Sequence, residues 1–119
     1  MSITITEHYH AVALRLKGEF FGSIQGKAFR DAVATLRDKG KTNIVFDLSQ
    51  TTLMDSSGIG VLIETAQELR THNGDLRMAE LEAKMRNLFL MTRLLGEVFQ
   101  IFDTVDEAVE SFSAAPDAA

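Results

Sequence analysis

The chain of 119 residues contains no cysteine and a single proline. Without cysteine it can form neither disulfide bonds nor thiolate metal sites, which favours a reducing compartment. No apolar run approaches the roughly 20 residues that a transmembrane helix needs. The first residues alternate like a strand and lack the basic and apolar regions of a signal peptide. We therefore expect a cytoplasmic protein with no direct membrane insertion.

Positive charge is also in short supply. Lys and Arg together number 12 against 17 Asp and Glu, which gives a formal net charge of −5. The basic residues are scattered along the chain, whereas a nucleic-acid-binding surface gathers them to neutralise phosphates. The same acidity disfavours binding to an anionic membrane surface. No nucleic acid is expected as a partner, and a protein partner is the default that remains.

Hydrophobic spacing predicts one α/β domain with a mixed β-sheet. Period-two alternation over residues 3–16 predicts a hairpin, and the apolar run 44–48 predicts a central strand. Short strands are expected at 76–79 and 98–102. Helical spacing predicts about four helices, at 28–36, 59–71, 85–95 and 104–112, the last capped by Asp103 or Thr104. We expect the domain to span residues 1–112 and a flexible tail to span 113–119.

The segment from residue 48 to residue 60 joins the central strand to the second helix and concentrates polar chemistry in one turn. Two hydroxyls, a carboxylate and two glycines occur together there: Asp55, Ser56, Ser57, Gly58 and Gly60, with Ile59 between the glycines. A helix N-terminus presents unpaired N–H groups and partial positive charge, which favour a negative group. The turn is therefore suited to receiving a phosphate, and much less to running a reaction.

A simpler interpretation is that these polar residues cap the helix. We expect one side chain of the turn to accept a backbone N–H bond, and Ser57 to have mainly this role. Capping does not explain Gly58 and Gly60, because each glycine costs a helix up to about 1 kcal/mol relative to alanine. Two glycines in the first turn suggest that another helix of the domain, or another protein, approaches the backbone there.

Three patterns that would indicate an enzyme or a metal site are incomplete. The Gly-Lys-Thr sequence at 40–42 lacks the upstream glycine of a P-loop, because Thr35 stands there, and the order of strand and helix is reversed. His8 and His10 would share one strand face, but no third ligand is evident. Neither serine of the turn lies in a Gly-x-Ser-x-Gly sequence or has an evident histidine base. We expect no catalysis, no metal and no cofactor.

The chain resembles the STAS-domain family of anti-sigma-factor antagonists along nearly all its length. The resemblance is carried by Gly18-Glu19, by the strand 44–48, by the segment 54–62 with its Asp-Ser-Ser-Gly sequence, and by the segment 102–108. It implies helices packed largely on one side of the sheet and a switch operated by phosphorylation. In the family the phosphorylated serine directly follows the aspartate. In this sequence that serine is Ser56, and Ser57 is the fallback.

The resemblance also implies partners. The kinase would be an anti-sigma factor of the ATP-binding serine-kinase type, and a serine phosphatase would reverse its action. The unphosphorylated protein would bind that kinase and free a sigma factor, and so regulate transcription indirectly. The candidate partner-binding residues are Asp55, Ser56, Ser57, Gly58, Ile59, Gly60, Phe20 and Phe21.

Two departures from the family pattern and one alternative function stay open. The family commonly has Gly-Glu-Leu-Asp at residues 18–21, so Phe21 stands in place of an acid, in a loop expected near the phosphorylation turn. Thr92-Arg93-Leu94 replaces a usual Thr-Gly-Leu at the end of the third helix. The alternative is a non-phosphorylated STAS docking subunit of a membrane lipid-transport ABC complex. An exposed Phe20–Phe21 pair would favour it, because exposed aromatic residues anchor stable partners.

Overall fold

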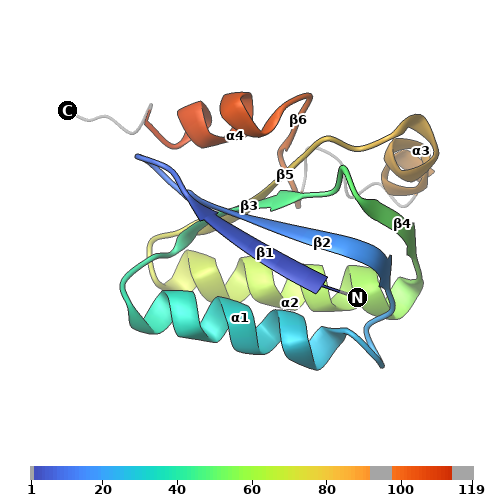
Figure 1. The fold of residues 1–119 in the computed structure, drawn as a ribbon, viewed down its shortest axis with the longest axis horizontal. Helices are drawn as coiled ribbons and strands as arrows, with labels where there is room; N and C mark the ends of the chain where they lie inside the picture. The colour runs from blue at the N-terminus through green and yellow to red at the C-terminus, as the bar shows by residue number, and fades with distance from the viewer. Residues whose placement is uncertain (1, 92–97, 114–119) are drawn as a thin grey trace.

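The computed structural model describes residues 2–91 and 98–113. Its strands form one mixed sheet in the order β1-β2-β3-β5-β6, and β4 pairs with the end of β2 (Figure 1). In chain order the elements are β1 (Ser2–Glu7), β2 (Val12–Phe20), α1 (Gly26–Asp38), β3 (Asn43–Asp47), β4 (Thr51–Met54), α2 (Ser56–Thr71), β5 (Asp75–Ala79), α3 (Ala83–Met91), β6 (Ile101–Phe102) and α4 (Val105–Ser111).

The predicted hairpin and central strand are confirmed. β1 pairs antiparallel with β2 from Ser2 opposite Lys17 to Glu7 opposite Val12. β3 lies between β2 and β5 and is parallel to both. Four of its five side chains are buried, as the continuous apolar run predicted. The predicted α/β class with a mixed sheet is therefore confirmed.

The short strand β4 was not predicted. It pairs with β2 from Gly18 to Phe20. The register shifts between Gly18 and Glu19, and the Gly18 backbone takes a φ of 107°. Thr51 anchors it, because the buried Thr51 hydroxyl donates to the carbonyl of Leu16 at 2.8 Å. β4 ends at Met54, directly before Asp55 and the start of α2, so it positions this turn.

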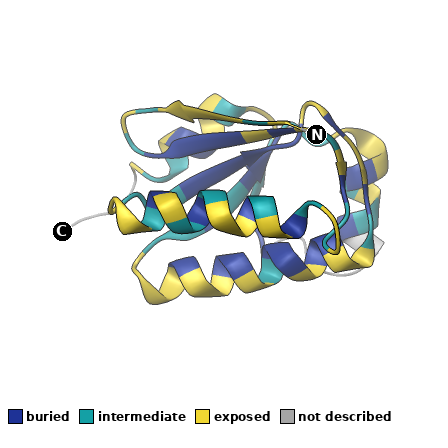
Figure 2. Ribbon diagram, turned by 60° about the horizontal axis from the view of Figure 1, so that its bottom comes forward, coloured by how far each residue is buried: buried dark blue, intermediate teal, exposed yellow. Residues whose placement is uncertain are grey.

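The main hydrophobic core lies between the sheet and the pair α1 and α2, which run side by side beneath it (Figures 1 and 2). Its centre is a cluster of fully buried rings from Phe20, Phe29 and Phe46, with centroids 5.0–5.6 Å apart. α4 packs on the opposite face, where Ala108 and Val109 join a smaller cluster. Most of the helical packing is thus on one side of the sheet, as expected.

The helix ends are defined by local hydrogen bonds. Of the two residues expected to cap α4, Thr104 does so: its hydroxyl accepts from the Glu107 N–H, and the Glu107 carboxylate accepts from the Thr104 N–H. The expected continuation of α3 to residue 95, the Thr92-Arg93-Leu94 departure and the tail at 114–119 lie outside the described residues. Across 2–91 and 98–113, none of the helices combines the length and apolarity needed to cross a bilayer.

Candidate functional site

Asp55 caps α2 and organises the turn that precedes it. Its backbone is extended (φ −103°, ψ 177°), and Oδ1 of its carboxylate accepts from the Gly58 N–H at 2.8 Å and the Ser57 hydroxyl at 2.7 Å. The expectation that one side chain of the turn caps the helix is confirmed, but the choice of Ser57 is wrong. Only the residue just before the helix has the extended backbone that brings a side-chain oxygen onto the third N–H. Ser57 is already inside α2 and donates to the cap instead.

The same contacts set the charge of the turn. The Ser57 hydroxyl, followed by the Gly58 N–H, lowers the pKa of the Asp55 carboxyl below its usual value, because both donors stabilise the ionised form. Asp55 is therefore an anion at neutral pH, and it lies directly beside Ser56.

The loop between β2 and α1 packs against this turn, as the resemblance led us to expect. The Gly22 N–H donates to the same Asp55 oxygen at 3.4 Å. A Cβ atom on Gly22 would lie 2.2 Å from the Ser57 carbonyl oxygen, so only glycine allows this approach. Phe21 is half-buried in this loop, and its N–H donates to the Gln25 side chain at 2.8 Å. The position where the family carries an acid is thus aromatic and lies next to the turn.

The two serines of the turn differ in their hydrogen bonding. Both are exposed. Ser57 uses its hydroxyl to hold Asp55, whereas the Ser56 hydroxyl has no partner within the described part of the chain. Ser56 is the first residue of α2, so its side chain lies at the positive end of the helix. Ser56 is the hydroxyl that an external enzyme can reach without breaking a hydrogen bond.

The two glycines also have separate explanations. Gly58 is buried, and a Cβ atom there would lie 2.4 Å from the carbonyl oxygen of Phe20. The close approach that the glycines suggested is therefore made at Gly58 by β2 of the same domain, not by another helix. Gly60 is exposed, and a Cβ atom there would meet no atom of residues 2–91 or 98–113 within 4 Å. It lies one turn from Ser56 on the same helix face, and this face is open.

Two residues proposed as partner contacts belong to the core. Phe20 is fully buried and packs edge-on against Phe29 and Phe46. It is therefore not a surface anchor, because its position at the end of β2 turns its ring under the sheet. Ile59 is 8% exposed and joins the same core. Neither side chain is free to contact a partner.

Sequence reasoning missed two exposed apolar residues near the turn. Ile24 is 68% exposed two residues after Gly22, and Leu53 is 43% exposed two residues before Asp55. Leu53 borders a groove of about 320 Å³ between β4 and α3, which is also lined by Met54 and Met85. No signal in the sequence indicates this exposure, because a single isoleucine or leucine in a short segment can be buried or exposed.

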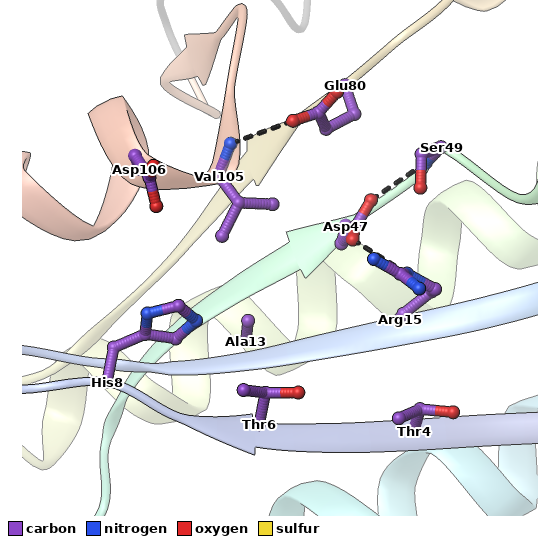
Figure 3. Close-up of a pocket in the computed structure, with 10 residues that line it drawn as sticks. All are labelled: Thr4, Thr6, His8, Ala13, Arg15, Asp47, Ser49, Glu80, Val105 and Asp106. Carbon is purple, nitrogen blue, oxygen red and sulfur yellow. Dashed lines mark hydrogen bonds and ion pairs between the residues drawn. The ribbon is translucent and has the colours of Figure 1, made fainter.

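A second, polar cavity of about 350 Å³ lies on the opposite face of the sheet, beside α4 (Figure 3). Its charges are largely paired within the protein. Arg15 donates to Asp47 at 2.9 Å, and the Val105 N–H donates to Glu80 at 3.0 Å. His8 lines this cavity, but no group of three or more potential metal ligands occurs within the described ranges. Its walls do not include the Ser56 turn.

Comparisons with a family model, a curated relative and solved structures all match this chain to STAS-domain proteins or anti-sigma factor antagonists. The STAS domain model matches residues 2–108. BtrV of Bordetella bronchiseptica, an anti-sigma factor antagonist by name, is 30% identical over 78 residues, or 66% of each chain, just under two thirds of the relative's length. TM1081 of Thermotoga maritima superposes with a TM-score of 0.83 at 21% identity, covering 93% of this chain and 94% of that one. Phosphorylated SpoIIAA of Bacillus superposes with a TM-score of 0.68 at 24% identity, covering 92% and 98%. The chain therefore belongs to the STAS-domain family.

Proposed function

We propose that the protein is an anti-sigma factor antagonist controlled by phosphorylation of Ser56. Unmodified, it binds an anti-sigma factor that is a serine kinase; phosphorylation by that kinase releases it, and a serine phosphatase restores it. The protein is then a substrate and a ligand rather than an enzyme, and it regulates transcription indirectly. The observation that carries the proposal is the exposed, unbonded hydroxyl of Ser56 at the start of α2, beside the ionised Asp55.

The hydrogen-bond pattern supports Ser56 over its neighbour. Phosphorylation of Ser57 would replace a hydroxyl donor to Asp55 by an anion 2.7 Å from the carboxylate. That change would break the cap and create like-charge repulsion inside the turn. Phosphorylation of Ser56 leaves the Asp55 contacts to Ser57 and Gly58 in place. The fold therefore tolerates the modification at Ser56 far better.

The charge change is large enough to control binding. A phosphate adds about −1.5 to −2 charges at neutral pH, which brings the total on Asp55 and Ser56 to about −2.5 to −3. The N-terminus of α2 favours an anion, so the domain itself stays folded. A partner that contacts the Ser56 hydroxyl would instead meet the charge and the volume of a phosphate group. Misplaced charge at an interface costs several kcal/mol, and about 4 kcal/mol reduces affinity a thousandfold.

The surface around the turn is suited to a protein partner. Gly60 lets a partner approach the helix backbone one turn beyond Ser56. Two exposed apolar side chains lie on the segments that lead to this turn: Ile24 in the loop between β2 and α1, and Leu53 in β4. They take the place of Phe20, which is buried in the core, and they supplement Phe21, which is half-buried beside the turn.

The test is a capture experiment with matched variants. The unaltered protein, Ser56→Ala, Ser56→Asp and the control Ser49→Asp are each immobilised and exposed to an extract of the native cells. Ser49 is exposed and lines the polar cavity on the other face, so Ser49→Asp adds the same charge away from the turn. We expect the unaltered protein, Ser56→Ala and Ser49→Asp to capture an ATP-binding serine kinase and Ser56→Asp to lose it. Equal capture of that kinase by Ser56→Asp contradicts the proposal.

A permanent docking subunit of a membrane lipid-transport complex is the second candidate. It loses the support expected from Phe20, which is buried, and it keeps the exposed Leu53 beside the apolar groove. In that case Ser56→Asp retains its partner and the protein co-purifies with membrane transport subunits. Loss of the same partner in Leu53→Asp, with Ser56→Asp unaffected, would favour this candidate.

A further inference from the structure

β1 is an edge strand without the usual protection against pairing. It lies at one end of the strand order and, among the described strands, pairs only with β2; Figure 2 shows it exposed along the sheet edge. Its pairing runs without a bulge from Ser2 to Glu7. The sequence Ser-Ile-Thr-Ile-Thr-Glu has no proline and no lysine, and its single charge is at the end. Natural proteins usually block such edges with prolines, bulges or inward charges.

The hairpin geometry identifies which backbone groups are free. The His8 N–H donates to the Ala11 carbonyl, which makes this a hydrogen-bonded pair next to Glu7 and Val12. Antiparallel strands alternate hydrogen-bonded and non-bonded pairs. The N–H and C=O groups of residues 2, 4 and 6 therefore face β2, and those of Ile3, Ile5 and Glu7 point outward.

We infer that β1 pairs antiparallel with β1 of a second copy, about a two-fold axis through Thr4. In this register Ile3 of each copy exchanges two hydrogen bonds with Ile5 of the other. Ile5, which is 45% exposed in the single chain, then packs beside Ile3 of the second copy. Ile3 already packs against the main core, so the contact extends that core across the dimer.

The charges favour a second copy in this register. Within residues 2–6 both copies present only hydroxyl and aliphatic side chains, so no like charges oppose one another. Glu7 falls beyond the paired segment and has its own partner in Lys41, at 3.1 Å. A two-fold axis also requires the same patch on both copies, which a palindromic pairing of Ile3 with Ile5 satisfies. The contact is a single strand pair, so the dimer is weak and depends on concentration.

This inference does not rest on the proposed function. β2 separates β1 from β3 and β4, so the turn at Ser56 stays accessible in the dimer. The dimer then presents two Ser56 turns, whether or not they are phosphorylated. Its presence can be measured without any partner.

The test uses single cysteine variants, which are clean because the chain has no cysteine. Thr4→Cys places two cysteines opposite each other at a non-bonded pair, with Cα atoms about 4.5 Å apart, within disulfide range. The control Thr6→Cys makes the same change on the same strand face. Its two introduced thiols would be separated by four residues of strand, about 14 Å, which is too far to bridge. We expect oxidation to convert Thr4→Cys to a covalent dimer at least tenfold faster than Thr6→Cys.

Sedimentation of the unaltered protein gives the second measurement. We expect the average mass to rise toward that of a dimer with concentration, and Ile5→Lys to remove this rise. Ile24→Lys is the matched control, because it makes the same change at an exposed isoleucine in the loop before α1. Circular dichroism checks that each variant is folded. Equal cross-linking of the two cysteine variants, or dimerisation that Ile5→Lys leaves unchanged, overturns the inference.

Discussion

Alanine at the two glycines of α2 should change stability in opposite directions. A Cβ atom at Gly58 would lie 2.4 Å from the Phe20 carbonyl oxygen and 3.1 Å from the Met54 side chain. Ordinary contact begins near 3.4 Å, so β2 or the first turn of α2 must move by 3.4 − 2.4 = 1.0 Å. At Gly60 the added methyl group has no neighbour within 4 Å in the described part of the chain.

The magnitudes follow from these two environments. Overpacking at Gly58 costs about 1–3 kcal/mol, and the gain in helix propensity offsets up to about 1 kcal/mol. Subtracting that gain, we expect Gly58→Ala to lower the free energy of unfolding by up to about 2 kcal/mol. Gly60→Ala should raise it by up to about 1 kcal/mol, because only the propensity term remains.

Urea unfolding followed by circular dichroism measures both variants under the same conditions. An unchanged dependence on urea concentration would show that the difference arises in stability rather than in the unfolded state. If Gly58→Ala is as stable as Gly60→Ala, the close approach of Phe20 to α2 is not what requires glycine, and the explanation of the two glycines fails.

Three further predictions address the core, a helix cap and the charge of the turn. Phe20→Ala should cost about 3–5 kcal/mol of unfolding free energy in urea, and Phe21→Ala clearly less; equal losses would contradict the burial of Phe20. Thr104→Ala should cost about 0.5–2 kcal/mol through the capping box, and an unchanged melting temperature would show that this cap contributes nothing. The pKa of Asp55 is lower in the folded protein than in the unfolded chain, so ionised Asp55 stabilises the fold. This stabilisation is complete above the unfolded pKa and is lost as the pH falls through the folded pKa. Titration by carbon NMR should give a raised Asp55 pKa in Ser57→Ala; an unchanged value would exclude the hydroxyl as the main cause.

The sequence predicted the elements whose signal is long and periodic. The hairpin, β3 and the four helices follow from apolar spacing, and the Asp-Ser-Ser-Gly turn was placed at the start of a helix, where the structure has it. β4 was missed because four residues with two exposed side chains carry no alternation, and because its pairing depends on the bend at Gly18.

Details that depend on a single residue of register could not be predicted. Successive strand residues point to opposite faces, so two neighbouring phenylalanines are equivalent in sequence until the end of β2 is known; Phe20 then points into the core. Likewise, Asp55 rather than Ser57 is the cap because α2 begins at Ser56, and helix ends are uncertain by one or two residues from sequence. The exposure of Ile24 and Leu53 depends on tertiary packing alone.

We propose that Ser56 is the phosphorylated residue of a switch. The most direct measurement is intact-mass and peptide mass spectrometry of the protein purified from its native cells under several growth conditions. We expect a fraction of molecules to carry one phosphoryl group, located on Ser56 and absent in Ser56→Ala. A phosphate on Ser57 alone, or none under any condition, would contradict it.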